Sequence, residues 1–303
     1  MAKILDKKYD VISSPILWKF LNAASYTYRT PIIEKPLLFR LSRIRHHKFK
    51  IMDKIGEEQN INDIDLSQNF NEIAQIQNII KTIQFSTAYK DLVRTVIQRS
   101  LDNLIHNLDY FRDYPNRSVE EQQNFLQYLH NDAMSELVKQ FPDQPELTDN
   151  FTPTPVTLKT NPETERASGH QSLFSTNIEA GKNTSPIRAV AVLYHETTHR
   201  IEHIWGTLYY ENKSIIPRAL KEDAALIFLG QTSSSYIPPA FLGYYAMQYN
   251  ENLAIEISHL TIDTLKKAVS KSDWPEDEKL EFYRGLEDCL PKKEILDIAY
   301  APM

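Results

Sequence analysis

The chain of 303 residues is long enough for one large domain or two smaller ones. Its formal net charge of -6 argues against a nucleic-acid-binding role, which normally requires a strongly basic domain. With only 7 glycines, it has no phosphate-binding loop and no dinucleotide fingerprint, and its single cysteine, Cys289, excludes an internal disulfide framework. No signal-peptide pattern opens the chain and no apolar stretch approaches the length of a membrane span, so we expect a soluble protein without a signal peptide.

The first half of the chain has the apolar spacing of packed helices. Apolar residues recur every three or four positions at Ile73, Ile76, Ile80 and Ile83, and again at Leu92, Val96, Leu101, Leu104, Ile105 and Leu108. Ser118 and Glu121 form a capping-box pattern that predicts the start of a further helix. We therefore expect residues 1–145 to form a helical region, a possible targeting or substrate-recognition module. It includes a basic run at residues 40–50 whose role stays open.

The composition changes after this region. Prolines gather in a polar segment that cannot sustain a helix: Pro142, Pro145, Pro153, Pro155 and Pro162. Residues 156–160 and 172–178 follow, rich in strand-favouring residues and separated by turn formers. We expect a domain boundary near residue 145 and a second domain over residues 146–303. The fold class is then mainly α with a small β-sheet (α+β).

A helix with buried polar residues is predicted in this second domain. Ser185 provides an N-cap before Pro186 at the first helical position, and Gly206 is placed to end the helix, so we expect it over residues 186–205. Its first turns, residues 187–194, are apolar almost all round, which indicates that the helix crosses the interior. Two histidines and a glutamate on such a helix need partners, because a buried polar group without one costs about 1 to 3 kcal/mol.

These polar residues have the spacing of a zinc site. His195 and His199 lie one turn apart on one helix face, so both imidazoles can bind one ion. Glu196 lies about 100° round the helix, beside the metal, where its carboxylate can deprotonate a zinc-bound water. The pattern supplies two ligands and a general base.

A third protein ligand must come from elsewhere in the chain. His203 lies one turn further along the same helix, but three histidines in line cannot close tetrahedrally round one ion without bending the helix. Glu251 shares a helical stripe with Ile255, Ile262, Leu265 and Val269 and should face inward, whereas Glu256 falls on the polar face. Glu222 also lines up with apolar neighbours. We favour Glu251 and keep Glu222 as the alternative.

The His195-Glu196-x-x-His199 helix, followed by a glutamate on a later helix, resembles the gluzincin group of zinc peptidases. The closer similarity is to the catalytic domain of anthrax lethal factor and related bacterial toxin peptidases, in which a tyrosine shortly precedes a Glu-x-x-Ala ligand helix. Here Tyr244 and Tyr245 precede Glu251. The resemblance implies a zincin-like catalytic domain in which Tyr244, or else Tyr245, steadies the oxyanion.

The leading hypothesis is a zinc-dependent endopeptidase that cleaves a specific protein, with Glu196 as base and Zn2+ held by His195, His199 and Glu251. The strand at residues 172–178 would pair with an extended peptide substrate. The toxin-like motif suggests a bacterial effector, cytoplasmic or translocated into a host cell. The alternatives are a partner-binding helical protein with a degenerate metal site and a metal-dependent amide hydrolase that is not a protease. The oligomeric state stays open.

Overall fold

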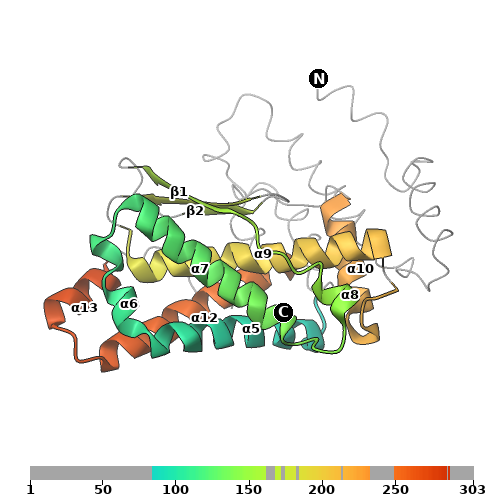
Figure 1. Cartoon of the computed structure of the whole chain (residues 1–303), viewed down its shortest axis with the longest axis horizontal. Coiled ribbons are helices and arrows are strands. Elements are labelled where there is room, and N and C mark those ends of the chain that lie inside the picture. Colours follow the sequence, from blue (N-terminus) through green and yellow to red (C-terminus); the bar gives the residue numbers. More distant parts are fainter. Residues whose placement is uncertain are drawn as a thin grey trace, which may run out of the picture. The chain divides into compact units, whose positions relative to one another are not determined.

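A computed structural model of the chain describes residues 84–161, 168–171, 175–181, 184–212, 214–232, 249–284 and 286. Labels follow Figure 1. The α-helices are α5 Thr87–His106, α6 Leu108–Arg112, α7 Val119–Val138, α8 Pro145–Thr148, α9 Pro186–Asn212, α10 Lys221–Thr232, α12 Tyr249–Lys271 and α13 Glu276–Tyr283. The 3-10 helices are η3 Tyr114–Asn116 and η4 Arg218–Leu220, and the strands are β1 Val156–Asn161, β2 Ser168–Gln171 and β3 Thr176–Gly181. The prediction of a mainly helical fold with a small sheet is confirmed.

Most of the described residues belong to one compact unit, formed by Phe85–Ile227 and Asn250–Glu294. A second unit comprises Met1–Gln84, Phe228–Tyr249 and Ile295–Met303, nearly all of it outside the described residues. The predicted boundary near residue 145 falls inside the first unit, because α7 packs on α5 and α9 and also on β1. A separate N-terminal module therefore remains a prediction only for the residues before 84.

One helix start before the sheet was predicted, and it is found. Ser118 and Glu121 form the expected capping box at the start of α7. Ser86 caps α5, and the Asp223 carboxylate in turn accepts hydrogen bonds from the Ser86 amide at 2.7 Å and its hydroxyl at 2.6 Å. The proline-rich segment does contain one short helix, because Pro145 occupies the first helical position, where its missing amide hydrogen is not needed.

The sheet has the strand order β1-β3-β2, with β1 parallel and β2 antiparallel to β3. The strand expected over residues 172–178 is found from Thr176 to Gly181, and β2 was not predicted. The expectation of a free edge on that strand is wrong, because Ile178 pairs with Leu158 on one side and Gly169 on the other. Among the described strands, β2 and β1 form the edges.

Helix α9 has 27 residues and continues past the glycine that was expected to end it. Gly206 is buried inside the helix. Trp205 before it and Leu208 after it are buried as well. The Trp205 ring packs edge-on against Phe141 and Phe151. Burial of these side chains outweighs the cost of a mid-helix glycine, about 1 kcal/mol relative to alanine.

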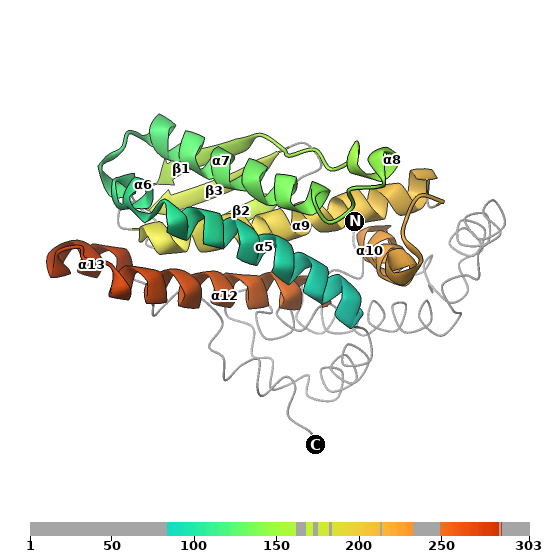
Figure 2. The ribbon, with the colours of Figure 1, turned by 60° about the horizontal axis from the view of Figure 1, so that its bottom comes forward.

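Helix α12 runs antiparallel to α9, as Figure 2 shows. Glu251, near its start, lies beside His199, whereas Ser258 lies two turns later, near Ala191. The Ser185 hydroxyl, expected to cap α9, donates to the Phe282 carbonyl in α13 and so ties the start of α9 to the helix that follows α12. None of the described helices is both long enough and apolar enough to cross a membrane.

Candidate metal centre

The two histidines of α9 point their outer ring nitrogens at one another. His195 and His199 lie one helical turn apart, and their Nε2 atoms are 3.2 Å apart. Both rings are mostly buried, with side-chain exposures of 17% and 12%. The apolar first turns of α9 therefore place two imidazoles in the interior, with their lone-pair positions directed to one point.

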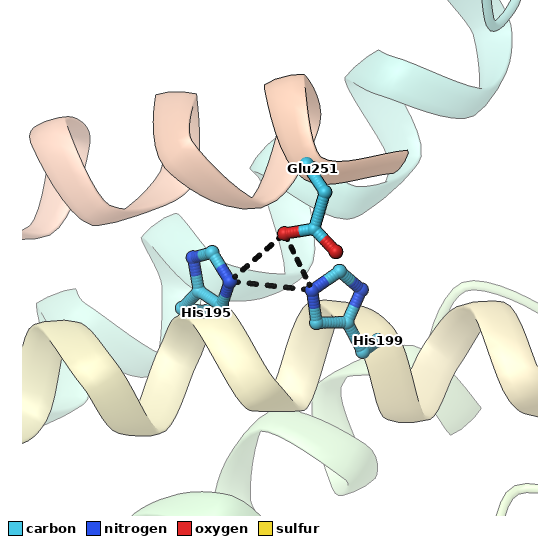
Figure 3. A group of neighbouring side chains, drawn as sticks. All are labelled: His195, His199 and Glu251. Carbon is cyan, nitrogen blue, oxygen red and sulfur yellow. Dashed lines mark hydrogen bonds and ion pairs between the residues drawn. The ribbon is translucent and has the colours of Figure 1, made fainter. Parts of the chain in front are cut away.

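Helix α12 brings a carboxylate to the same point. The Glu251 Oε2 atom lies 3.5 Å from His195 Nε2 and 3.4 Å from His199 Nε2 (Figure 3). The apolar stripe that Glu251 shares with Ile255, Ile262, Leu265 and Val269 is buried, as the helical phase predicts. Among the described residues, His195, His199 and Glu251 form a group whose side chains could together hold a metal ion.

The three donor atoms fit a tetrahedral metal ion. A tetrahedron with ligand bonds of about 2.0 to 2.1 Å has edges of about 3.3 to 3.4 Å. The observed triangle of His195 Nε2, His199 Nε2 and Glu251 Oε2 has sides of 3.2, 3.5 and 3.4 Å. The Oε2 atom is also buried and makes no hydrogen bond of good geometry, so its contacts at this point are the two imidazoles at 3.5 and 3.4 Å. The donor set therefore fits a cation.

The electrostatics of the group agree with this fit. Burial disfavours the charged form of His199, but the carboxylates of Glu251 and Glu202 outweigh it and raise the pKa of the imidazole well above its ordinary value. Burial likewise opposes ionisation of Glu251, yet the charge of His199 and the contacts with both imidazoles hold the pKa of that carboxyl far below its usual range. Both shifts favour a positive charge beside the Glu251 carboxylate, and a bound cation would supply that charge in place of a proton.

Two further side chains contact the inner ring nitrogens of the histidines. The Glu202 carboxylate lies 2.9 Å from His199 Nδ1, and the Ser258 hydroxyl lies 3.4 Å from His195 Nδ1. Because a carboxylate only accepts, Nδ1 of His199 carries a proton, and Nε2 is the nitrogen that an ion would bind. Sequence reasoning missed both residues. The signal was present in their spacing, three residues after His199 and seven after Glu251.

The expected base, Glu196, is 5% exposed and lies against the edge strand. A Cβ atom on Gly169 of β2 would lie 2.5 Å from both Cγ and Oε1 of Glu196. Only a glycine allows the strand backbone to come this close to the carboxylate. This contact could not be predicted from the sequence, because no strand was predicted over residues 168–171.

The other candidates are not part of the group. Glu222 is exposed, and its neighbour Asp223 is the buried carboxylate of α10. His203 is half-buried, one turn beyond His199, and does not belong to the three ligands. Tyr244, Tyr245, Cys289 and the basic run at residues 40–50 lie outside the described residues.

Comparison of the chain with protein-family models, curated proteins and solved structures finds no match. The function is therefore inferred from the geometry of the site.

Proposed function

We propose that the protein is a zinc-dependent hydrolase, an endopeptidase, with its centre at His195, His199 and Glu251. The observation that carries the proposal is the buried triangle of two imidazole nitrogens and one carboxylate oxygen, with sides of 3.2 to 3.5 Å. Two histidines and a glutamate form a donor set that suits zinc, and no other side chain of the described residues occupies the fourth tetrahedral position. Catalytic zinc sites keep such a position, whereas structural ones fill it with a protein ligand.

The chain's own residues have separate roles in this reaction. When bound, zinc would supply a Lewis acid that polarises a carbonyl and makes water more acidic. Glu196, next to His195 in the sequence but not one of the three ligands, would accept the proton of the attacking water and later pass it to the leaving amine. Glu202 holds His199 in the tautomer that a ligand needs. The oxyanion role of Tyr244 or Tyr245 is proposed from the resemblance alone.

The edge strand supports a peptide as substrate. Strand β2 has β3 on one side only among the described strands, so its other edge can accept an extended peptide. Gly169 brings the backbone of β2 against Glu196, so a peptide paired there would run past the base. This revises the substrate strand from residues 172–178 to Ser168–Gln171. The toxin-like motif favours one specific protein as the target.

The test separates metal binding from turnover. Protein stripped with a chelator and reloaded should bind close to one zinc per chain, and His195→Ala with His199→Ala should abolish binding. Glu196→Ala should keep the zinc but reduce cleavage of a peptide library about a hundredfold or more, because a base is not needed to bind the ion. Glu222→Ala, an exposed carboxylate on another helix, is the matched control and should change neither.

Full zinc occupancy in the double histidine variant would refute the site. Undiminished cleavage by Glu196→Ala, on any peptide that the wild type cleaves, would refute the mechanism. Zinc binding without cleavage of any library peptide would favour the partner-binding protein or the non-peptidase hydrolase.

A further inference from the structure

A further buried histidine, His130, lies outside the metal centre. His130, on α7, has an exposure of 0%, and its ring connects two parts of the site's framework. Its Nδ1 atom is 2.9 Å from the hydroxyl of Thr197, which lies between the two α9 ligands in the sequence. Its Nε2 atom is 3.1 Å from the backbone nitrogen of Thr154, just before β1.

The hydrogen bonds of His130 have only one consistent direction. Burial, together with the charge of Arg200, lowers the pKa of His130 to about 4, so the ring is neutral near pH 7 and has one N–H. The Thr154 amide can only donate, so Nε2 accepts and Nδ1 donates to Thr197. The Thr197 hydroxyl then donates to the Leu193 carbonyl at 2.8 Å. Each polar atom of the ring therefore has a partner.

The chain of hydrogen bonds continues from Thr154 into the sheet. The Thr154 hydroxyl lies 2.7 Å from the Thr176 hydroxyl in β3, which donates to Gln171 Oε1 in β2 at 2.5 Å. Exposures of 4%, 0% and 7% show that all three side chains are buried. In such a water-poor environment the bonds reinforce one another, and their geometry is fixed. Through this network His130 connects α9 to the edge strand β2.

The hydrogen-bond network ends at Gln171, close to the contact between β2 and Glu196. Gln171 is two residues from Gly169 on β2, so the two positions share one face of the strand. Gly169 is the residue whose backbone lies against Glu196. We propose that His130 is a positioning residue that fixes β2 relative to α9 and so holds Glu196 beside the metal ligands. This inference rests on the proposed function, but the strand itself can be observed without metal.

Two substitutions each keep half of the connection. His130→Asn retains a donor near Nδ1 for Thr197, and His130→Gln retains an acceptor near Nε2 for Thr154. Both substitutions should loosen β2 if the complete hydrogen-bond network from Thr197 to Gln171 is needed. Ser100→Ala is the matched control. The Ser100 hydroxyl joins α5 to α9 through Tyr194 at 2.9 Å, with both residues 0% exposed, but it does not lead to β2.

The first measurement is amide hydrogen exchange of residues 168–171 in the metal-free protein. Both His130 variants should raise this exchange about tenfold, and Ser100→Ala should leave it unchanged. The second is the pH profile of the visible spectrum of protein loaded with Co2+. Its midpoint should shift in the His130 variants in the same direction as in Glu196→Gln, with metal affinity retained. Turnover should fall about 10- to 100-fold at unchanged KM.

The outcomes are distinct. Exchange at β2 and a Co2+ profile that match those of Ser100→Ala would overturn the role of His130. A wild-type protein that binds neither Zn2+ nor Co2+ would refute the proposed function, and exchange at β2 would still decide whether His130 holds the strand. A merely structural role predicts lower stability in all three variants without a shift of the Co2+ profile, and that result would also overturn the proposal.

Discussion

Replacing Gly169 by alanine should move the base without touching a ligand. The new Cβ would meet Glu196 Cγ and Oε1 at 2.5 Å and Cδ at 2.8 Å. Favourable contacts between such atoms need about 3.5 Å, so either the strand or the carboxylate must shift by about 1 Å. Glu196 is 5% exposed and has little space to move without disturbing its surroundings.

A displacement of this size has a large kinetic effect. A misplacement of about 1 Å in a catalytic site can cost about a hundredfold in rate, or about 2.7 kcal/mol in activation free energy. We therefore expect Gly169→Ala to reduce kcat about a hundredfold while zinc affinity stays within a few-fold of the wild type, because no ligand is changed. Isothermal titration with zinc and a fluorogenic peptide selected from the library would measure the two quantities separately.

Ser168→Ala is the control for this experiment. Ser168 is exposed, precedes Gly169 on the same strand and faces the opposite side of the sheet. A Gly169→Ala protein with normal kcat would show that Glu196 tolerates the added methyl group. That result would refute the claim that the close approach of β2 positions the base. A large loss of zinc binding in that variant would show that β2 supports the ligands instead of the base.

Three further predictions concern metal affinity and stability. Glu251→Gln should weaken zinc binding severely, whereas Glu222→Gln should leave it unchanged because that side chain is exposed. A competition assay with a chelator would measure both affinities, and the reverse ranking would assign the third ligand to Glu222. Glu202→Gln should weaken zinc binding about 10- to 100-fold, since the amide orients the ligand imidazole less firmly, and an unchanged affinity would rule this role out. Burial lowers the pKa of His130 from 6.5 to about 4, so between these two pH values the unfolded chain binds more protons than the folded one. The difference corresponds to about 3 kcal/mol of stability, which is present above pH 6.5 and should be lost as the pH falls towards 4. Urea unfolding at several pH values would measure this loss, and an equally steep loss in His130→Gln would contradict the assignment.

The sequence predicted those parts of the fold that depend on local pattern. The capping box at Ser118 and the buried stripe of α12 both follow from residues a few positions apart, and both are found. The predicted end of α9 was wrong, because Gly206 ends a helix only when nothing beyond it needs burial, and Leu208, two residues beyond it, is buried. Strand β2 was missed because four residues with little apolar alternation form a strand only when β3 is present to pair with them.

The candidate site shows the same division. The spacing of His195 and His199 was enough to place both imidazoles on one face, because one helix defines it. Helical phase could not decide between Glu251 and Glu222, because it gives the buried face of a helix but not the helix against which that face packs. The positions of Gly169 and His130 depend on contacts between segments distant in sequence, for which no local pattern exists.

The division of the ligand triangle between two helices affects how the protein folds. Two donors belong to α9 and the third to α12, so the complete triangle exists only after these helices have packed. An ion that binds the folded chain and not the unfolded one adds about 1.4 kcal/mol to the free energy of unfolding for each tenfold rise in its free concentration above Kd. Bound zinc would then act as a concentration-dependent cross-link between α9 and α12, and the thermal stability of the protein would report the metal supply of its surroundings.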